Sequence, residues 1–413
     1  MVYKKLTRIP TMPFLESSGN VLIIGTTLID VQGNQFIHYN EVTASDAGMT
    51  KLLEATAAEA FYNSAERFPP PRCHPATRQR ILSHIKTWSR ALKDESPLTA
   101  SNRILFLCGP VGSGKTAIAQ TLSEEYGENG VLAASFFFAR GRDRRGGIGH
   151  FVATIAYQLS ISIPIIRDLI GMIIARDPSV LRQSTDVQFQ KLIVDPFKSA
   201  FCGVPIISSQ HPFLIIIDGL DECDNDNHQE VILYYTSALI YKHCLPLAFL
   251  FTSRPNPLMQ DCVQTNSFLK LNPPYTIFLA SSVKDTFTFL ESGFHEIRRT
   301  HEIMATVSEP WPSAEEIKKL LYKSSGHFIY ASTVLKFVGD ENANPTERLA
   351  LVLSEESAPL AELDELYNQI LSTASNRALL RRATLSPSRK TKLPAIPDHF
   401  QSGSNHVRQS HQD

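Results

Sequence analysis

The chain lacks paired cysteines, an excess of either charge, and any apolar run long enough to cross a bilayer. Its six cysteines occur singly, with no C-x-x-C pair, which argues for reduced thiols and against a zinc site. The formal net charge is −1, so no general attraction draws the chain to nucleic acid or an anionic membrane. The most apolar long stretch, residues 161–175, is interrupted by Arg167 and Asp168. With no signal peptide visible, these absences predict a cytoplasmic protein with neither a membrane nor a nucleic-acid partner.

What the chain does have is enough apolar sequence for a buried core. It contains 413 residues, of which 43% are hydrophobic and 20% charged, a balance typical of globular proteins with two or three domains. No repeat of fixed period is present. The composition therefore favours a globular fold over a fibrous or repeat architecture.

One stretch has a direct chemical meaning: residues 109–116 read G-x-x-x-x-G-K-T, the phosphate-binding loop called Walker A. Glycines allow the backbone to curl so that successive N–H groups point at phosphate oxygens. The lysine would place its ammonium between the outer phosphates, and the threonine offers a hydroxyl to Mg²⁺. The predicted nucleotide-binding residues here are Gly109, Pro110, Val111, Gly112, Ser113, Gly114, Lys115 and Thr116.

The sequence on both sides of this loop is what a phosphate site requires. Residues 103–108 form a short apolar run that predicts a buried strand. Residues 115–126 have helical apolar spacing, and Gly127 is expected to end that helix. The positive end of the helix dipole would then face the bound phosphate.

Two further strands are predicted to bring acidic and basic side chains to the same edge. Residues 213–218 are five apolar residues ending in Asp218, which with Thr116 would supply oxygen ligands for Mg²⁺. Asp221 and Glu222 follow, and Glu222 is the first choice to orient or deprotonate an attacking water. Arg254 follows the strand at 245–252 and could contact the γ-phosphate of ATP or GTP. Alternatively, Asp221 could cap a helix and Arg254 could pair with an acid.

The rest of the chain predicts strands alternating with helices, and hence a parallel sheet covered by helices on both faces. A strand is expected at 131–138 and another at 275–279. Helices are expected at 49–68, 75–91, 148–162, 165–175, 187–199 and 228–242, followed by 283–299, 314–322, 328–338 and 363–371. Near the N-terminus, residues 21–25 and 35–39 predict either a hairpin or a loose apolar arm.

These patterns divide the chain into five parts. We expect an irregular or hairpin segment at 1–48, a helical linker at 49–95, the P-loop NTPase domain at 96–280 and a helical region at 281–372. The remaining residues, 373–413, form a basic tail expected to be disordered. Its basic residues could serve in localisation or nucleic-acid binding, or could simply be solvated. The glycine-rich loop 139–147, with four arginines, could likewise bind phosphate or an acidic partner, or be a solvated loop.

Several of these motifs together resemble the NACHT family, which belongs to the STAND class of signalling NTPases. Residues 109–116, 214–223 and 251–255 resemble its Walker A, Walker B and sensor segments, and the Asp-Gly-Leu-Asp-Glu run is the most distinctive. Four other stretches resemble the NACHT proteins abundant in mushroom-forming fungi: residues 64–75, 135–141, 325–331 and 363–371.

The resemblance implies a nucleotide-gated switch. A diphosphate would hold a closed monomer, and exchange for ATP or GTP with Mg²⁺ would open it toward a homo-oligomer, with slow hydrolysis as the reset. Such a switch could act in fungal non-self recognition. The chain departs from the pattern in two places. Residues 326–328 read Gly-His-Phe where related proteins often have Gly-x-Pro, and C-terminal sensor repeats are absent, which suggests a truncated form or a sensor or effector on separate proteins.

Three rival interpretations remain open from the sequence. A metabolic P-loop kinase or transport ATPase should show a lid or a transporter signature, and neither is evident. An AAA-type nucleic-acid motor should show a basic balance. A nucleotide-binding scaffold that does not hydrolyse is the third, and it differs from a slow switch only in phosphate release.

Overall fold

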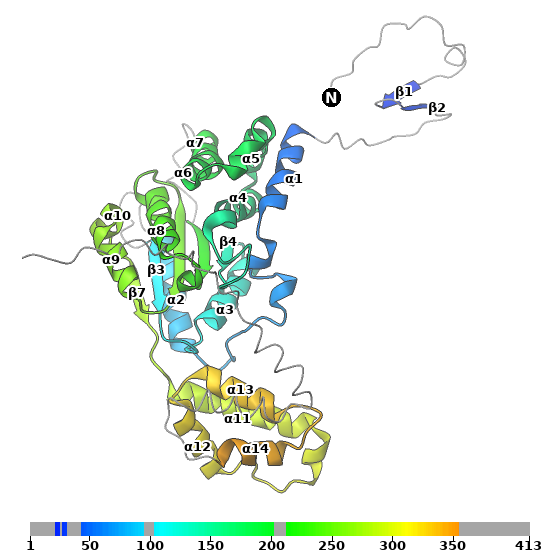
Figure 1. Cartoon of the computed structure of the whole chain (residues 1–413), viewed down its shortest axis with the longest axis vertical. Coiled ribbons are helices and arrows are strands. Elements are labelled where there is room, and N and C mark those ends of the chain that lie inside the picture. The colour runs from blue at the N-terminus through cyan, green and yellow to red at the C-terminus, as the bar shows by residue number, and fades with distance from the viewer. Residues whose placement is uncertain (1–20, 25–26, 31–42, 95–102, 202–211, 355–413) are drawn as a thin grey trace, which may run out of the picture. The chain divides into compact units, whose positions relative to one another are not determined.

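The computed structural model describes residues 21–24, 27–30, 43–94, 103–201 and 212–354. It contains a five-stranded sheet in the order β4-β5-β6-β3-β7, of which Figure 1 labels β3, β4 and β7. The strands are β3 (Ile104–Cys108), β4 (Leu132–Phe137), β5 (Phe213–Asp218), β6 (Leu247–Ser253) and β7 (Tyr275–Phe278). β3 runs parallel to both β6 and β7, with Phe106 opposite Phe251 and Thr276. This confirms the predicted α/β class with a parallel sheet, and the chain has a P-loop NTPase-type fold.

The sheet order explains where a ligand can bind. β3 lies between β6 and β7, whereas the next strand in sequence, β4, lies at the far edge. The chain therefore leaves β3 toward one edge of the sheet, while β7 pairs with β3 on its other side. Open parallel sheets bind ligands where the strand order reverses in this way, beyond the carboxyl ends of the strands. All five residues of β3 are buried, so this central strand gives the loop that follows it a rigid base.

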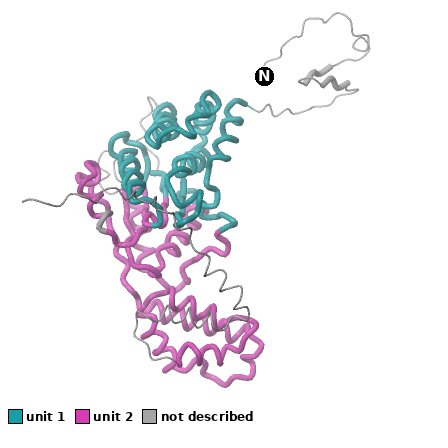
Figure 2. Tube along the Cα trace, viewed as in Figure 1, with its two compact units in different colours: residues 1–66, 129–215, 222–248 teal, residues 67–128, 216–221, 249–413 magenta. Residues whose placement is uncertain are grey.

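The chain separates into two compact units (Figure 2). Unit 1 comprises residues 1–66, 129–215 and 222–248, and unit 2 comprises residues 67–128, 216–221 and 249–413. The helices of unit 1 are α1 (Ala44–Ala55), α4 (Phe151–Ser162), α5 (Pro164–Arg176), α6 (Thr185–Phe189), α7 (Asp195–Ala200) and α8 (Asp226–Tyr241). Those of unit 2 are α2 (Gln79–Asp94), α3 (Lys115–Glu128), α9 (Pro257–Thr265), α10 (Ser267–Leu271), α11 (Val283–Thr300), α12 (Ala314–Ser324), α13 (Phe328–Val338) and α14 (Pro345–Leu353).

Short turns of other helix types complete the described elements. The 3₁₀ turns are η2 (Ala58–Ala60), η3 (Ala65–Arg67), η4 (Ile148–His150), η5 (Pro178–Arg182), η7 (Leu220–Glu222) and η8 (Glu302–Thr306). A π-helical turn, η6 (Gln190–Val194), joins α6 to α7, so the helix predicted at 187–199 is one helical stretch with a bulge. In the part of the chain that the structure describes, no helix is both long and apolar enough to cross a membrane.

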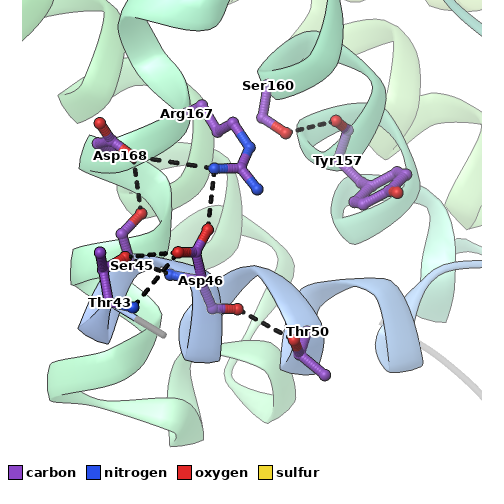
Figure 3. A network of polar contacts seen from close by, with 8 residues as sticks. All are labelled: Thr43, Ser45, Asp46, Thr50, Tyr157, Ser160, Arg167 and Asp168. Atoms are coloured by element: carbon purple, nitrogen blue, oxygen red, sulfur yellow. Dashed lines mark hydrogen bonds and ion pairs between the residues drawn. The ribbon is translucent and has the colours of Figure 1, made fainter. Parts of the chain in front are cut away.

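In unit 1, α1 packs on α5 through small residues, and Figure 3 shows the polar contacts beside this packing. Gly48 and Gly171 approach so closely that a Cβ on Gly48 would lie 1.9 Å from the Gly171 carbonyl oxygen. At the end of this contact the Ser45 hydroxyl donates to Asp168 at 3.0 Å, and Arg167 donates to Asp46 at 3.1 Å. The absence of side chains at the crossing therefore fixes how near the two helices lie.

In unit 2, helices α11 to α14 share a hydrophobic core of their own. Its fully buried members include Leu290, Leu320 and Val334. α12 begins with a capping box, in which Ser313 and Glu316 each accept from the other's backbone N–H. The apolar periodicity that predicted helices at 283–299, 314–322 and 328–338 therefore reflects this core, and α13 has the predicted bounds.

Two local predictions are wrong. α1 begins at Ala44 and ends at Ala55 rather than spanning 49–68, because Thr43 and Asp46 form a capping box and the chain then turns so that the Ala57 N–H donates to Thr154. α3 continues through Gly127, and the left-handed residue beyond it is Gly130, with φ +66°. Near the N-terminus, the strand predicted at 21–25 is found as β1 (Val21–Ile24), and it pairs with β2 (Thr27–Asp30), which the sequence did not predict.

The remaining predictions are untested, shifted in their bounds or missing. The second strand predicted at 35–39, the helix predicted at 363–371 and the basic tail lie outside the described residues. The helix predicted at 75–91 is found as α2, four residues later at its start. α9, α10 and α14 are helices that the sequence patterns did not predict.

Candidate functional site

The phosphate loop joins β3 to α3, as its sequence predicted. Gly112 has φ +72° and Gly114 has φ +91°, in the region where residues with a Cβ are strained. Within the loop, the Ser113 N–H donates to the Pro110 carbonyl at 3.3 Å. The Lys115 ammonium donates to the carbonyls of Gly109 and Pro110, at 2.8 and 3.0 Å. The loop thus has the curled backbone that a phosphate requires, and its lysine folds back over the curl.

Asp218 ends β5 and is 3% exposed. The Thr252 hydroxyl of β6 donates to it at 2.6 Å, and Thr116 at the start of α3 is a second hydrogen-bond partner. Burial raises the pKa of the Asp218 carboxyl, while these hydrogen bonds and the charges of Arg67 and Lys115 act to lower it. The two residues predicted as Mg²⁺ ligands are therefore in direct contact at the edge of the sheet.

Hard oxygen donors of this kind fit Mg²⁺. The ion prefers carboxylate and hydroxyl oxygens and keeps several waters, and Thr116 and Asp218 supply one hydroxyl and one carboxylate from adjacent elements. Among the described residues, no group of three or more His, Cys, Asp or Glu side chains is arranged so that it could hold a metal ion by itself. The remaining ligands would therefore have to be phosphate oxygens and water.

Asp221 and Arg254 form an ion pair in the same unit. The Arg254 backbone N–H donates to one Asp221 oxygen at 3.0 Å, and its Nε donates to the other at 3.0 Å. The Asp221 carboxylate is almost buried, whereas half of the Arg254 side chain is exposed. A cavity of about 340 Å³, lined in part by Cys108 and Phe278, adjoins Arg254. Asp221 thus orients the arginine, which has space to move away from it.

Glu222 directly follows Asp221 in η7 and is half-buried. The Asp221 carboxylate, in contrast, is paired with Arg254. The assignment of Glu222 as the water-orienting residue stays a prediction.

The helical region of unit 2 contacts the phosphate loop directly. The Phe328 N–H, at the start of α13, donates to the Gly112 carbonyl at 3.1 Å. A Cβ on Gly112 would lie 2.3 Å from the Ile329 side chain. The stretch 326–328, where the resemblance to the NACHT family led us to look for Gly-x-Pro, therefore ends at the residue that contacts the loop. The sequence signalled this stretch but not the contact.

Sequence reasoning missed other residues of the site. Thr252 connects β6 to β5, since it donates to Asp218 and accepts from the Gly219 N–H at 2.9 Å. Arg67 lies in η3, far upstream of the loop, and yet its charge acts on Asp218. The signals available were the Thr-Ser-Arg-Pro segment and the resemblance of residues 64–75 to NACHT sequences, which marked both stretches without giving roles.

The arginine-rich loop at 139–147 has a structural role within unit 1 that neither sequence alternative named. Arg144 donates to the carbonyls of Glu54 and Thr56, the first at 2.9 Å, and Arg145 to that of Glu59 at 3.5 Å. The Gly141 N–H donates to Asp224 at 2.9 Å. Two of the four arginines therefore hold the end of α1 and the segment that follows it.

Comparison with known proteins gives one family match. The family described as Nephrocystin 3, N-terminal, matches residues 76–254, which is less than half of the chain. The matched part runs from just before α2 to Arg254, and so includes the phosphate loop and Asp218. No curated protein shows significant similarity to the chain.

Solved structures resemble the fold only distantly. PCH-2 of C. elegans is 12% identical, with a TM-score of 0.39 over 73% of this chain and 72% of that one. The ORC2 protein of Aeropyrum pernix, solved with ADPNP and ADP, is 13% identical, with a TM-score of 0.41 over 74% of this chain and 75% of that one. DnaA from Aquifex aeolicus, bound to AMPPCP, is 12% identical, with a TM-score of 0.30 over 69% of this chain and 82% of that one. Likenesses this weak carry no functional argument.

Proposed function

We propose that the chain is a cytoplasmic nucleotide-gated switch of the NACHT type, which binds ATP or GTP with Mg²⁺ and converts nucleotide state into self-association. The phosphate loop, Asp218 and Arg254 supply the binding site, and the helical region α11 to α14 supplies the part that responds. Partners would be further copies of the chain when activated, and separate sensor or effector proteins.

One observation carries this proposal: the hydrogen bond from the Phe328 N–H to the Gly112 carbonyl. Gly112 belongs to the loop that would follow the phosphates, and Phe328 is the first residue of α13. A change in the loop on exchange of diphosphate for triphosphate would move the acceptor on which α13 rests. A switch needs such a direct link, because a ligand shifts an equilibrium only through contacts that differ between the two states.

Each charged residue has a place in the proposed cycle. Lys115 and Arg254 would contact the outer phosphates, and Asp221 would hold Arg254 ready until a γ-phosphate is present. Thr116 and Asp218 would hold Mg²⁺, which would neutralise phosphate charge when bound. Glu222 would orient the water for a slow hydrolysis that resets the switch.

Oligomeric state tests the proposal. Purified protein would be loaded with ADP or GDP, or with a non-hydrolysable triphosphate, and its mass measured by light scattering after gel filtration. We expect a monomer with diphosphate and a larger assembly with triphosphate. The same mass with diphosphate and with triphosphate would contradict the proposed switch, and the nucleotide that co-purifies would decide between adenine and guanine.

Hydrolysis is tested separately from binding. The Glu222→Gln variant should retain nucleotide affinity within about three-fold while phosphate release falls at least about 100-fold, in line with removal of a general base. The matched control is Glu230→Gln, on the exposed side of α8. If wild type and Glu222→Gln release phosphate equally slowly, the chain does not hydrolyse nucleotide through Glu222. The proposal of a switch that resets by hydrolysis would then give way to that of a nucleotide-binding scaffold.

A further inference from the structure

Arg78 is a buried cation at the point where the linker enters α2. It is 6% exposed, and burial lowers the pKa of its guanidinium. Its backbone has φ +55°, a left-handed conformation uncommon for a residue with a side chain. Its Nε finds no hydrogen-bond partner among the described residues. Three separate costs are concentrated in one residue, and such strain gathers at sites where position matters.

The guanidinium reaches the phosphate loop. Nη2 donates to the Ser113 carbonyl at 2.8 Å, and Nη1 donates to the Ala280 carbonyl, just beyond β7, at 3.1 Å. In a trans peptide the C=O and the following N–H point in opposite directions. By holding the Ser113 carbonyl, Arg78 also fixes the direction of the Gly114 N–H, one of the loop donors expected to face phosphate.

The same residue reaches the helical region. Its guanidinium carbon lies 5.0 Å from the centre of the Phe328 ring, within the range of a cation–π contact. Its backbone N–H donates to Asp285 of α11 at 3.4 Å. Because the Phe328 N–H in turn donates to Gly112, loop, arginine and α13 form a closed circuit of contacts.

The linker before Arg78 reinforces this arrangement from both sides. The Cys73 N–H donates to Thr121 of α3 at 3.0 Å, and the His74 ring is hydrogen-bonded to Ser292 of α11 at 2.9 Å. Residues 73–78 therefore bridge the helix that follows the phosphate loop and the first helix of the helical region, and Arg78 is the member that contacts the loop itself.

We propose that Arg78 is a positioning residue that orients the Ser113–Gly114 peptide of the phosphate loop and ties it to α13, so that loop geometry and helix docking change together. This role of Arg78 in regulation rests on the proposed function, because it matters for a switch only if the loop binds nucleotide. When α13 leaves the loop, Arg78 loses the Phe328 ring and its hold on the loop weakens. When bound phosphate fixes the loop, the guanidinium of Arg78 is held in place, and so is its contact with Phe328 of α13.

Hydrogen exchange measured by mass spectrometry tests the coupling in the nucleotide-free chain. In Arg78→Gln, exchange should be at least ten-fold faster than in wild type in two peptides, one covering 109–118 and one covering 326–338. The matched control is Arg80→Gln, at an exposed position two residues on, which should exchange like wild type. A peptide covering α8 in unit 1 reports whether the fold as a whole has loosened.

Two further variants test the same contacts. Phe328→Leu removes the aromatic ring that Arg78 contacts, and Arg78→Lys keeps the positive charge but loses the planar guanidinium. Both should accelerate exchange in the same two peptides, by less than Arg78→Gln. These variants also decide the matter if Arg78→Gln fails to fold. Unchanged exchange in the folded variants, or acceleration confined to α2, would overturn the proposal.

Nucleotide binding separates this inference from the proposed function. Calorimetric titration with ADP should give a roughly ten-fold weaker Kd for Arg78→Gln, a smaller loss for Arg78→Lys and none for Arg80→Gln. Equal affinity in Arg78→Gln and wild type would contradict the positioning role. If wild type and Arg80→Gln bind no nucleotide, the proposed function fails, and the exchange of the two peptides still decides whether Arg78 couples the loop to α13.

Discussion

Two places in the molecule depend on glycine for opposite reasons. In the phosphate loop, Gly112 adopts a φ of +72° that a side chain would strain, and it also lies against Ile329. In the contact between α1 and α5, Gly48 and Gly171 are ordinary helical residues, and what matters is the space that a side chain would occupy. Gly112 allows the curled backbone of the phosphate loop, whereas Gly48 and Gly171 allow the short distance between α1 and α5.

The surroundings differ in the same sense. At Gly112 and the next residue the contacts are hydrogen bonds to backbone carbonyls. The Phe328 N–H donates to the Gly112 carbonyl, and the buried Arg78 donates to the Ser113 carbonyl. Such bonds can be exchanged for others when a ligand arrives. Between α1 and α5 the contact is close packing of backbone on backbone, which protein interiors do not relax easily. We conclude that the loop contact suits a switch and that the helix contact suits a fixed anchor.

Gly112→Ala should produce the largest effect. A Cβ would meet the Ile329 side chain at 2.3 Å in a backbone region that already disfavours it. We expect nucleotide affinity to fall at least about 100-fold, equivalent to about 2.7 kcal/mol, measured by calorimetric titration.

Gly141→Ala is the matched control for that substitution. Gly141 has the same φ of +72°, and nothing lies within 4 Å of the added carbon. This variant should lose about 1–2 kcal/mol of stability from backbone strain alone and keep its nucleotide affinity within about three-fold. Equal losses of affinity in the two variants would mean that the contact with Ile329 has no role.

Gly48→Ala should come next in size and should affect stability rather than binding. The added carbon would lie 1.9 Å from a backbone oxygen of α5, which cannot rotate away. We expect a loss of about 2 kcal/mol in the free energy of unfolding and a fall in Tm of roughly 4–8 °C by differential scanning fluorimetry. Gly149→Ala, with open space around it, should change stability by less than about 0.5 kcal/mol. An unchanged Tm in Gly48→Ala would show that α1 is not anchored through this contact.

Asp46→Asn should have the smallest effect and should depend on pH. Hydrogen bonds from Thr43 and then Arg167 lower the pKa of Asp46 (Figure 3). A lowered folded-state pKa stabilises the fold above the unfolded pKa, and this contribution is lost as pH falls through the folded pKa. Wild type should therefore exceed Asp46→Asn in urea midpoint at pH 7, and the gap should narrow below about pH 4. A gap that is constant with pH would exclude the ionised carboxylate as its cause.

The same contrast shows what could be predicted from sequence. The bounds of β5 and α13 follow from continuous apolar or helical patterns, because such patterns report locally which face of an element is buried. The end of α3 could not be read from Gly127, since a single glycine costs only about 1 kcal/mol inside a helix and the left-handed turn is at Gly130. α9 and α10 were missed because they are short, and short helices owe their stability to tertiary packing.

The sequence by itself determined the chemistry of the site. The order of residues 109–116 and the acids after β5 specify a phosphate loop and an oxygen-rich edge, because each depends on neighbours in the chain. Tertiary structure decided which of those groups are held and by what. Arg78 contacts Ser113, Thr252 contacts Asp218 and Gly48 contacts Gly171 across long separations in sequence. Such contacts depend on how elements pack together, and the spacing of residues along the chain carries no record of that packing.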